Sequence, residues 1–177
     1  LFPWLRVAAN VAFPLTTLPI GRAERESRVA EALAAVGLAA AHRKYPWELS
    51  GGMQQRVAIA RAIAYRPRLL LMDEPFASVD AQTRADLEDL TLKVRRDFGM
   101  TVLFITHDID ESVYLADRVI VLRRSPGRIM AEIAVDLPPQ RDQIATKELD
   151  GFVRLRGEVA RLVRAAALGA AADPAIA

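Results

Sequence analysis

Three short apolar runs constrain the fold of this chain more than any other feature of its sequence. They are Leu69–Met72, Thr101–Ile105 and Val119–Leu122. None of them alternates with polar residues, and segments with helical character, the longest at 81–98, separate them. Uninterrupted apolar runs of this length are typical of parallel strands buried on both faces. The sequence therefore predicts an α/β fold whose middle part forms a parallel sheet flanked by helices.

The remaining segments predict mainly helices. An amphipathic pattern over 23–36 predicts one helix, and Ser50-Gly51-Gly52 opens a longer one that runs to about Tyr65. The prolines within 1–18 favour a short helix between turns. At the other end, 128–135 is expected to add an edge strand and 147–166 a terminal helix, and the Ala-rich stretch 165–172 reads as a frayed tail.

Composition narrows the class of protein. The chain has 177 residues, a formal net charge of +2 and no cysteine. A protein built around a nucleic acid would be expected to show a concentrated basic face. A chain without cysteine has neither a disulfide framework nor a thiolate metal site, and no stretch approaches the ~20 apolar residues of a membrane span. The chain begins at Leu1 without an initiator methionine, which leads us to expect that it is truncated at its N-terminus.

Residues whose side chains could bind a metal ion or take part in catalysis follow two of the apolar runs. Asp73-Glu74 ends the first run, and His107 follows the second. Ligands bind at the carboxyl ends of strands in an open parallel sheet. One carboxylate could hold Mg²⁺ while the other orients or deprotonates a water molecule. The alternative is that the acids only cap a helix and that the histidine is merely packed or exposed.

The Ser50-Gly51-Gly52 segment is the second candidate site. Two glycines allow a ligand to approach the backbone, and a helix N-terminus offers unpaired N–H groups that favour an anion such as a phosphate. The alternative is an ordinary helix start with Ser50 as its N-cap.

In their order along the chain, these residues resemble the motifs of the ATP-binding-cassette (ABC) ATPases. Leu49–Arg56 resembles the signature motif, Leu69–Pro75 the Walker B strand, Ser78–Asp80 the D-loop and Thr106–Asp108 the switch histidine. The resemblance covers about residues 1–140. The phrases Phe2–Leu5, Asp80–Arg84, Tyr114–Arg118 and Pro126–Ile129 are similar to those in the ATPases of nitrate, sulfonate and taurine importers.

The resemblance implies a partial P-loop NTPase (RecA-like) sheet with an α-helical subdomain. It places the helical subdomain at 1–48, the catalytic core at 49–136, and a C-terminal helix and tail at 137–177. Two such subunits would face head to tail and enclose two ATP molecules. Ser50, Gly51, Gly52 and Gln54 would then contact the ATP held by the partner subunit, and Asp80 would communicate across the dimer.

The resemblance also implies catalytic roles and partners. Asp73 would support Mg²⁺, Glu74 would be the general base, and His107 would touch the γ-phosphate. The helical subdomain would dock on transmembrane permease subunits at the cytoplasmic face of the membrane, with an external substrate-binding protein as an indirect partner and no nucleic acid. Closing on ATP and reopening after hydrolysis would drive the permease between two states.

The sequence departs from the family pattern in one major respect. It contains no G-x-x-x-x-G-K-[ST] loop, because none of its lysines, Lys44, Lys93 and Lys147, follows a glycine. Without that loop nothing cradles the β-phosphate. The residues tested alone are therefore expected to neither bind ATP in their own site nor hydrolyse it. The family's strand order also predicts a gap between the Thr101–Ile105 and Val119–Leu122 strands.

Two other function classes stay open at this point. A degenerate cassette could regulate an active partner without catalysis; the retained Glu74 and His107 argue against this alternative, but the missing phosphate loop keeps it open. A DNA-repair ATPase shares the signature and Walker B motifs, but such proteins interrupt the domain with long heptad repeats, which this sequence lacks.

Overall fold

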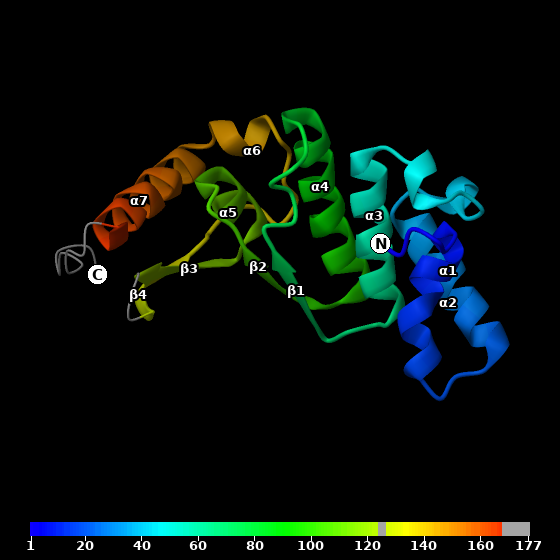
Figure 1. The fold of residues 1–177 in the computed structure, drawn as a ribbon. Helices are drawn as coiled ribbons and strands as arrows, with labels where there is room; N and C mark the ends of the chain where they lie inside the picture. Colours follow the sequence, from blue (N-terminus) through cyan, green and yellow to red (C-terminus); the bar gives the residue numbers. More distant parts are fainter. Residues whose placement is uncertain (124–126, 168–177) are drawn as a thin grey trace. The chain divides into compact units, whose positions relative to one another are not determined.

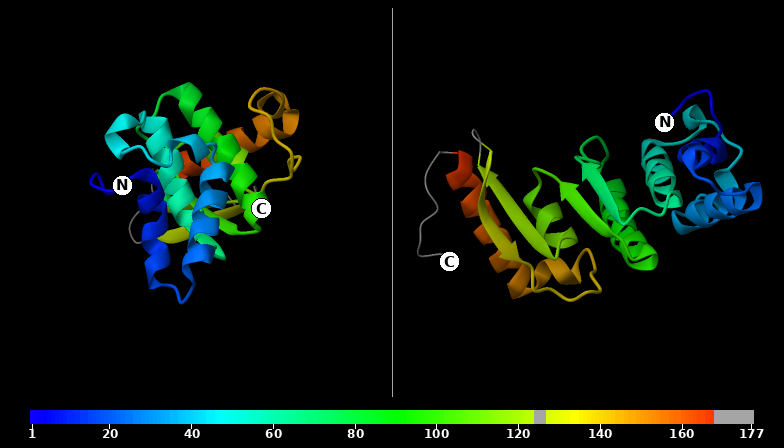
Figure 2. Two further views of the ribbon diagram at one scale, coloured as in Figure 1. Left: turned by 90° about the vertical axis from the view of Figure 1, so that its right-hand side faces the viewer. Right: turned by 90° about the horizontal axis from the view of Figure 1, so that it is seen from below.

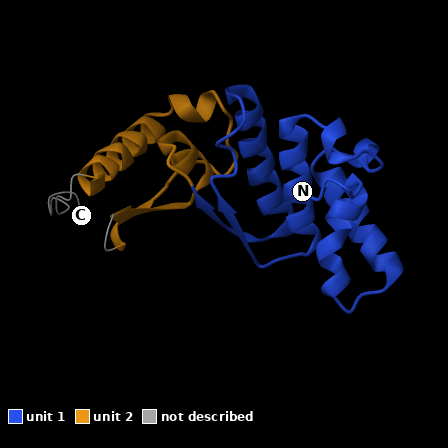
Figure 3. Ribbon diagram, in the orientation of Figure 1, with its two compact units in different colours: residues 1–105 blue, residues 106–177 orange. Residues whose placement is uncertain are grey.

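The computed structural model of the chain describes residues 1–123 and 127–167 (Figure 1). They form two compact units, residues 1–105 and the described part of 106–177 (Figure 3). The three-part division at residues 48 and 136 stays a prediction. Among the described residues, no helix is both long enough and apolar enough to cross a membrane.

The first half of unit 1 is a cluster of helices. It contains α1 (Val7–Ala12), α2 (Arg22–Ala35) and α3 (Gly51–Ala64), with short 3-10 turns at Phe13–Thr17, Ala39–Ala41 and Pro46–Glu48. The three α-helices contact one another. Their shared core contains the fully buried side chains Val7, Val11, Leu15, Val36, Val57 and Ile63. The predicted helices at 23–36 and 51–65 are confirmed to within about one residue at each end.

The second half of unit 1 is a parallel β-α-β segment. Strands β1 (Leu69–Asp73) and β2 (Thr101–Ile105) pair in parallel, with Leu69 opposite Thr101 and Asp73 opposite Ile105. Helix α4 (Ala81–Phe98) connects them and ends at Gly99, whose φ of 59° lies in the left-handed region that glycine tolerates. The predicted α/β class and these two parallel strands are confirmed.

One expectation for these strands is wrong. The apolar runs predicted strands buried on both faces, but alternate residues of both strands are exposed: Leu71 by 66% and Ile105 by 52%. The connecting helix α4 covers one side of the pair, since a single crossover places its helix on one face only (Figure 2). The other face of this two-stranded sheet is therefore exposed in unit 1.

Unit 2 contains an antiparallel hairpin and three helices. Strands β3 (Arg118–Arg123) and β4 (Arg128–Ala134) pair antiparallel, with a register irregularity at Val121/Leu122. The third apolar run therefore lies in an antiparallel pair and not, as expected, in a parallel one. Helices α5 (Ile109–Leu115), α6 (Ala145–Glu148) and α7 (Asp150–Ala167) complete the unit, and α7 contacts α5, β3 and β4.

The expected terminal helix at 147–166 is two helices, because Leu149 adopts an extended conformation between α6 and α7. The buried stripe of α7 is Phe152, Leu155, Val159, Leu162 and Ala166, a spacing of three and four residues that matches one face of a helix. The tail predicted at 165–172 lies outside the described residues from 168 onward. The strand gap predicted from the family concerns the relative placement of the two units and stays a prediction.

Candidate nucleotide-binding residues

The N-terminus of α3 is an exposed helix end in unit 1. Ser50 has an extended backbone (φ −65°, ψ 164°), and its Oγ accepts the N–H of Met53 at 3.3 Å, so it is the N-cap of α3. Ser50 and Gly51 are exposed, and a Cβ added to Gly51 would meet no atom within 4 Å. The first N–H groups of a helix have no intrahelical partner. Those at Gly51 and Gly52 therefore stand at an open helix end with a positive dipole, which suits an anion.

The segment that leads into Ser50 is fixed by its own side chains. The Gln54 amide nitrogen donates to the carbonyl oxygens of Pro46 at 3.1 Å and Leu49 at 3.4 Å. The Glu48 carboxylate accepts the N–H of Tyr45 at 2.6 Å. In this structure Gln54, which the resemblance assigns to ATP, holds the approach to α3 within its own chain. These hydrogen bonds of Gln54 therefore fix the position of Ser50.

Trp47 is exposed on the segment that precedes α3. Its ring stacks on Tyr45, with centroids 4.5 Å apart and an angle of 6° between the planes. The Arg6 guanidinium lies over the other partner of this pair, 4.8 Å from the centroid of the Tyr45 ring. Offset aromatic stacking and cation–π contact both favour a fixed arrangement. These two contacts therefore hold the segment that precedes α3.

Glu74 combines a candidate catalytic side chain with a strained backbone. It follows Asp73 at the carboxyl end of β1, and its N–H donates to the Ile105 oxygen at 2.9 Å, which extends the β1–β2 ladder by one bond. Its φ is 45°, in the left-handed region, although a residue before a proline usually adopts an extended conformation. Strained backbones of this kind concentrate at functional sites. Nothing in the sequence indicated this strain.

A short loop joins Glu74 to Asp80, the N-cap of α4. Its anchor is Phe76, which is 1% exposed and whose ring centroid lies 5.5 Å from that of Phe104 on β2. Sequence reasoning did not identify Phe76, although an aromatic residue between a strand-end acid and an N-cap is a signal that could have been used. The buried ring fixes the middle of the loop against the sheet.

Asp80 is the N-cap of α4 and holds Thr83. The Asp80 carboxylate accepts the Thr83 N–H at 3.0 Å and the Thr83 hydroxyl at 2.6 Å. These two bonds hold the pKa of Asp80 below its ordinary value, because both favour the charged carboxylate. Thr83 in turn touches the α3 N-terminus: an added Cβ on Gly52 would lie 2.5 Å from its methyl carbon. The structure thus brings Gly52 and Asp80 together through a residue that sequence reasoning missed.

His107 belongs to unit 2 and is exposed there. Its neighbours form a capped helix start: the Asp108 carboxylate accepts the N–H groups of Asp110 at 2.9 Å and Glu111 at 3.2 Å. The Thr106 hydroxyl donates to the buried Glu111 carboxylate at 2.7 Å. The segment around His107 is therefore held by its flanking residues.

Arg141 closes the other end of helix α5 in unit 2. Its side chain is 3% exposed, and its guanidinium donates to the carbonyl oxygens of Val113, Tyr114 and Ala116. A guanidinium carries several donors in a rigid fork and interacts favourably with a helix C-terminus. The helix that follows His107 is thus fixed at both ends.

The donor types in unit 1 fit a nucleotide and Mg²⁺. Backbone N–H groups and a serine hydroxyl at a helix start favour phosphate oxygens. Asp73 is exposed at the end of β1 and offers one carboxylate. Mg²⁺ is commonly held by one or two carboxylates together with waters and substrate phosphates. The described residues contain no cluster of three or more His, Cys, Asp or Glu side chains that could hold a metal without such help.

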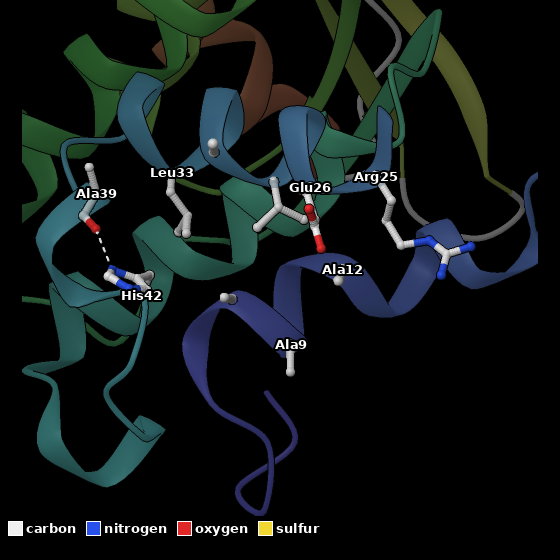
Figure 4. A pocket seen from close by; sticks show the side chains of 10 residues that line it. Ala9, Ala12, Arg25, Glu26, Leu33, Ala39 and His42 are labelled. Atoms are coloured by element: carbon white, nitrogen blue, oxygen red, sulfur yellow. Dashed lines mark hydrogen bonds between the residues drawn. The ribbon is translucent and has the colours of Figure 1, made fainter. Parts of the chain in front are cut away.

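An apolar groove of about 530 Å³ lies between α1 and α2 (Figure 4). Its floor is built from small and aliphatic side chains of both helices. Arg25 and Glu26 lie at one end and His42, which bonds the Ala39 oxygen at 2.9 Å, lies at the other. The complete lining is Ala8, Ala9, Ala12, Arg25, Glu26, Val29, Ala30, Leu33, Ala39 and His42.

Comparison with known proteins gives consistent results. Residues 1–77 match the family model described as ABC transporter. The aliphatic sulfonates import ATP-binding protein of Xanthomonas axonopodis pv. citri is 50% identical over 82% of this chain and 58% of its own length. The taurine import ATP-binding protein of Pseudomonas savastanoi is 48% identical over 77% of the chain and 52% of its length.

A third relative is the nitrate import ATP-binding protein of Synechococcus elongatus, which is 41% identical over 90% of this chain and 25% of its own length. The chain thus spans between a quarter and about three-fifths of the length of these relatives. All three relatives are named as import ATP-binding proteins. We conclude that residues 1–77 belong to the ABC transporter family, and that the chain as a whole is similar to ATP-binding proteins of import systems.

Proposed function

We propose that this chain works as part of a subunit that binds and hydrolyses ATP to drive import through an ABC transporter. The observation that carries the proposal is the open N-terminus of α3 at Ser50-Gly51, in the same unit as the strand-end acids Asp73 and Glu74. This combination offers donors for a phosphate and carboxylates for a cation and a water. The names of the relatives supply the direction of transport.

The individual roles follow from side-chain chemistry. Ser50, Gly51 and Gly52 donate to the terminal phosphate of an ATP that a second subunit holds, and Gln54 keeps that segment in place. Asp73 holds Mg²⁺ through a carboxylate oxygen or a bound water. The Glu74 carboxylate accepts a proton from the attacking water, and His107 donates to the γ-phosphate oxygens. ATP itself supplies the phosphoanhydride bond that is broken.

The phosphate loop must come from outside these 177 residues, because they contain no G-x-x-x-x-G-K-[ST] sequence. We therefore propose that these residues alone do not turn over ATP, and that they complete the ATP site of a partner subunit arranged head to tail. Measurable hydrolysis by the 177-residue polypeptide on its own would contradict the first part of this proposal.

We further place the contact with a permease subunit on the α1–α2 groove. Its apolar floor suits a short amphipathic helix, and Arg25 and Glu26 at its end offer charges for orientation. The subunit would then be peripheral, at the cytoplasmic face of the membrane, and a substrate-binding protein outside would act through the permease.

A mixing experiment tests the nucleotide-binding role. The probe is an ABC ATPase subunit with an intact phosphate loop whose own signature serine has been replaced, so that it is inactive by itself. Adding this chain should restore ATP hydrolysis, and the Ser50→Glu variant should not, because a carboxylate would repel the phosphate. The control is Ser27→Glu at an exposed position of α2, which should restore hydrolysis as well as the unchanged chain.

Two outcomes would refute the proposal. One is the absence of any restored hydrolysis with the unchanged chain. The other is restoration that Ser50→Glu leaves intact, which would instead favour a regulatory cassette that stimulates its partner without contacting the nucleotide.

A further inference from the structure

The closest approach at any glycine of the described residues is between Gly52 on α3 and Thr83 on α4. A Cβ on Gly52 would lie 2.5 Å from Thr83 Cγ2, a separation that real Cβ atoms essentially never show. The other two Thr83 side-chain atoms, Cβ and Oγ1, would each be 3.8 Å away, an ordinary van der Waals distance. One methyl group therefore accounts for the whole conflict.

Thr83 has little freedom to move that methyl group away. Its hydroxyl donates to one Asp80 oxygen at 2.6 Å and its N–H donates to the other at 3.0 Å. A rotation about χ1 would break the hydroxyl bond, and β-branched side chains in helices have few alternative rotamers. The D-loop carboxylate thus fixes the position of the methyl group that rests on Gly52.

The neighbours of Gly52 are the residues that the proposed function assigns to the nucleotide. Ser50 and Gly51 are exposed immediately before it, at the open start of α3. A displacement of the Gly52 backbone would carry the adjacent N–H groups with it. Misplacing a reacting group by about 1 Å can cost about 100-fold in rate.

We propose that Thr83 is a positioning residue for the signature segment: pinned by Asp80, its methyl group sets where the Gly51-Gly52 backbone stands. The D-loop cap and the signature helix are thereby linked inside one subunit. This inference rests on the proposed function, since it concerns the placement of groups that meet the nucleotide. According to this proposal, position 52 requires glycine because of a contact within the same subunit.

The test is a double-variant cycle of Gly52→Ala and Thr83→Ser. Serine removes Cγ2 and keeps the hydroxyl that bonds Asp80, so it should make room for the alanine Cβ. Unfolding by urea is followed by tryptophan fluorescence, because both tryptophans, Trp4 and Trp47, lie in unit 1. The two changes should couple by roughly 5- to 100-fold in the unfolding equilibrium constant, the range expected for relief of overpacking.

Gly51→Ala is the matched control for the contact. Its Cβ enters open space, so Thr83→Ser should show no coupling with it. If Gly52→Ala and Thr83→Ser prove additive, the proposed contact does not exist and the inference is overturned, whatever the activity.

Activity is then measured by restoring hydrolysis in the signature-disabled partner subunit. Gly52→Ala should lower the restored kcat at least tenfold at a temperature where urea unfolding shows the variant to be folded, and Thr83→Ser in the same chain should recover most of the loss. Recovered stability without recovered kcat would show a purely structural contact and would overturn the positioning role. If the unchanged chain restores no hydrolysis, the proposed function fails and the positioning role fails with it. Additivity of the two variants in a chain that does restore hydrolysis overturns the inference alone, so the two failures are distinguishable.

Discussion

The left-handed backbone of Glu74 allows the effect of backbone strain on stability to be measured separately from the effect of losing the carboxylate. Replacing Glu74 with glycine or with alanine removes the carboxylate in both cases, but only glycine relieves the φ of 45°. A left-handed conformation costs an L-residue roughly 1–2 kcal/mol of stability. Glycine avoids this cost but lowers the stability of the fold by about 0.4–1 kcal/mol, because it raises the entropy of the unfolded chain. Glu74→Gly should therefore be more stable than Glu74→Ala by about 0.5–1 kcal/mol.

Urea unfolding followed by the fluorescence of Trp4 and Trp47 measures this difference in unit 1. Two controls bracket it. Arg66, also left-handed with a φ of 57°, should show the same order of stability for its glycine and alanine variants. Lys93, exposed in the middle of α4, should show the reverse order by about 1 kcal/mol, because glycine weakens a helix interior.

The reasoning would be refuted if Glu74→Ala equalled or exceeded Glu74→Gly in stability while both controls behaved as expected. Activity gives an independent readout. If Glu74 is the general base, both variants lose the hydrolysis that depends on this carboxylate in the same subunit, despite their different stabilities. That assay needs a chain that contains both Glu74 and a phosphate loop. A Glu74→Gly variant with retained hydrolysis would remove Glu74 from the proposed mechanism.

Three further predictions concern other parts of the chain. The hydrogen bonds from Thr83 lower the pKa of Asp80, so the ionised carboxylate stabilises the fold at pH values above its unfolded-state pKa of about 3.9, and this contribution is lost as the pH falls. In urea titrations between about pH 6 and pH 3, the Asp80→Asn variant should therefore lose less stability than the unchanged chain. Arg141→Ala should destabilise unit 2 by about 2–4 kcal/mol and speed amide hydrogen exchange in α5, because buried carbonyl groups lose a charged donor, whereas Arg154→Ala on the exposed side of α7 should change exchange little. Leu71→Lys on the exposed face of β1 should change the free energy of unfolding by less than about 0.5 kcal/mol and raise the solubility limit of the polypeptide, measured by light scattering.

Features governed by local chemistry could be predicted from the sequence. Ser50 accepts the N–H three residues on, as an N-cap serine does, and Gly99 ends α4 in a left-handed conformation, as expected for a helix-stopping glycine. The strand positions of 69–73 and 101–105 also followed from uninterrupted apolar runs. In each case the controlling residues lie within a few positions of the feature they determine.

Features that depend on distant partners could not be predicted in this way. The apolar runs could not reveal that Leu71 and Ile105 would be exposed, since burial depends on what covers a face and not on the strand itself. The clamp of Arg141 on α5 spans 25 to 28 residues, and no spacing rule points to it. The pairing of Gly52 with Thr83 is likewise invisible in a motif that treats each glycine as a contact for phosphate.

The loop from Glu74 to Asp80 connects these observations physically. Its first residue is bonded through its N–H to the Ile105 oxygen on β2, and the buried ring of Phe76 anchors it against the same strand. Its last residue pins Thr83, whose methyl group rests on the start of α3. A loop held at both ends and in the middle acts as a spacer of fixed length between the strand-end acids and the signature helix. The left-handed φ of Glu74 and the close approach of Thr83 to Gly52 therefore lie at the two ends of one anchored segment.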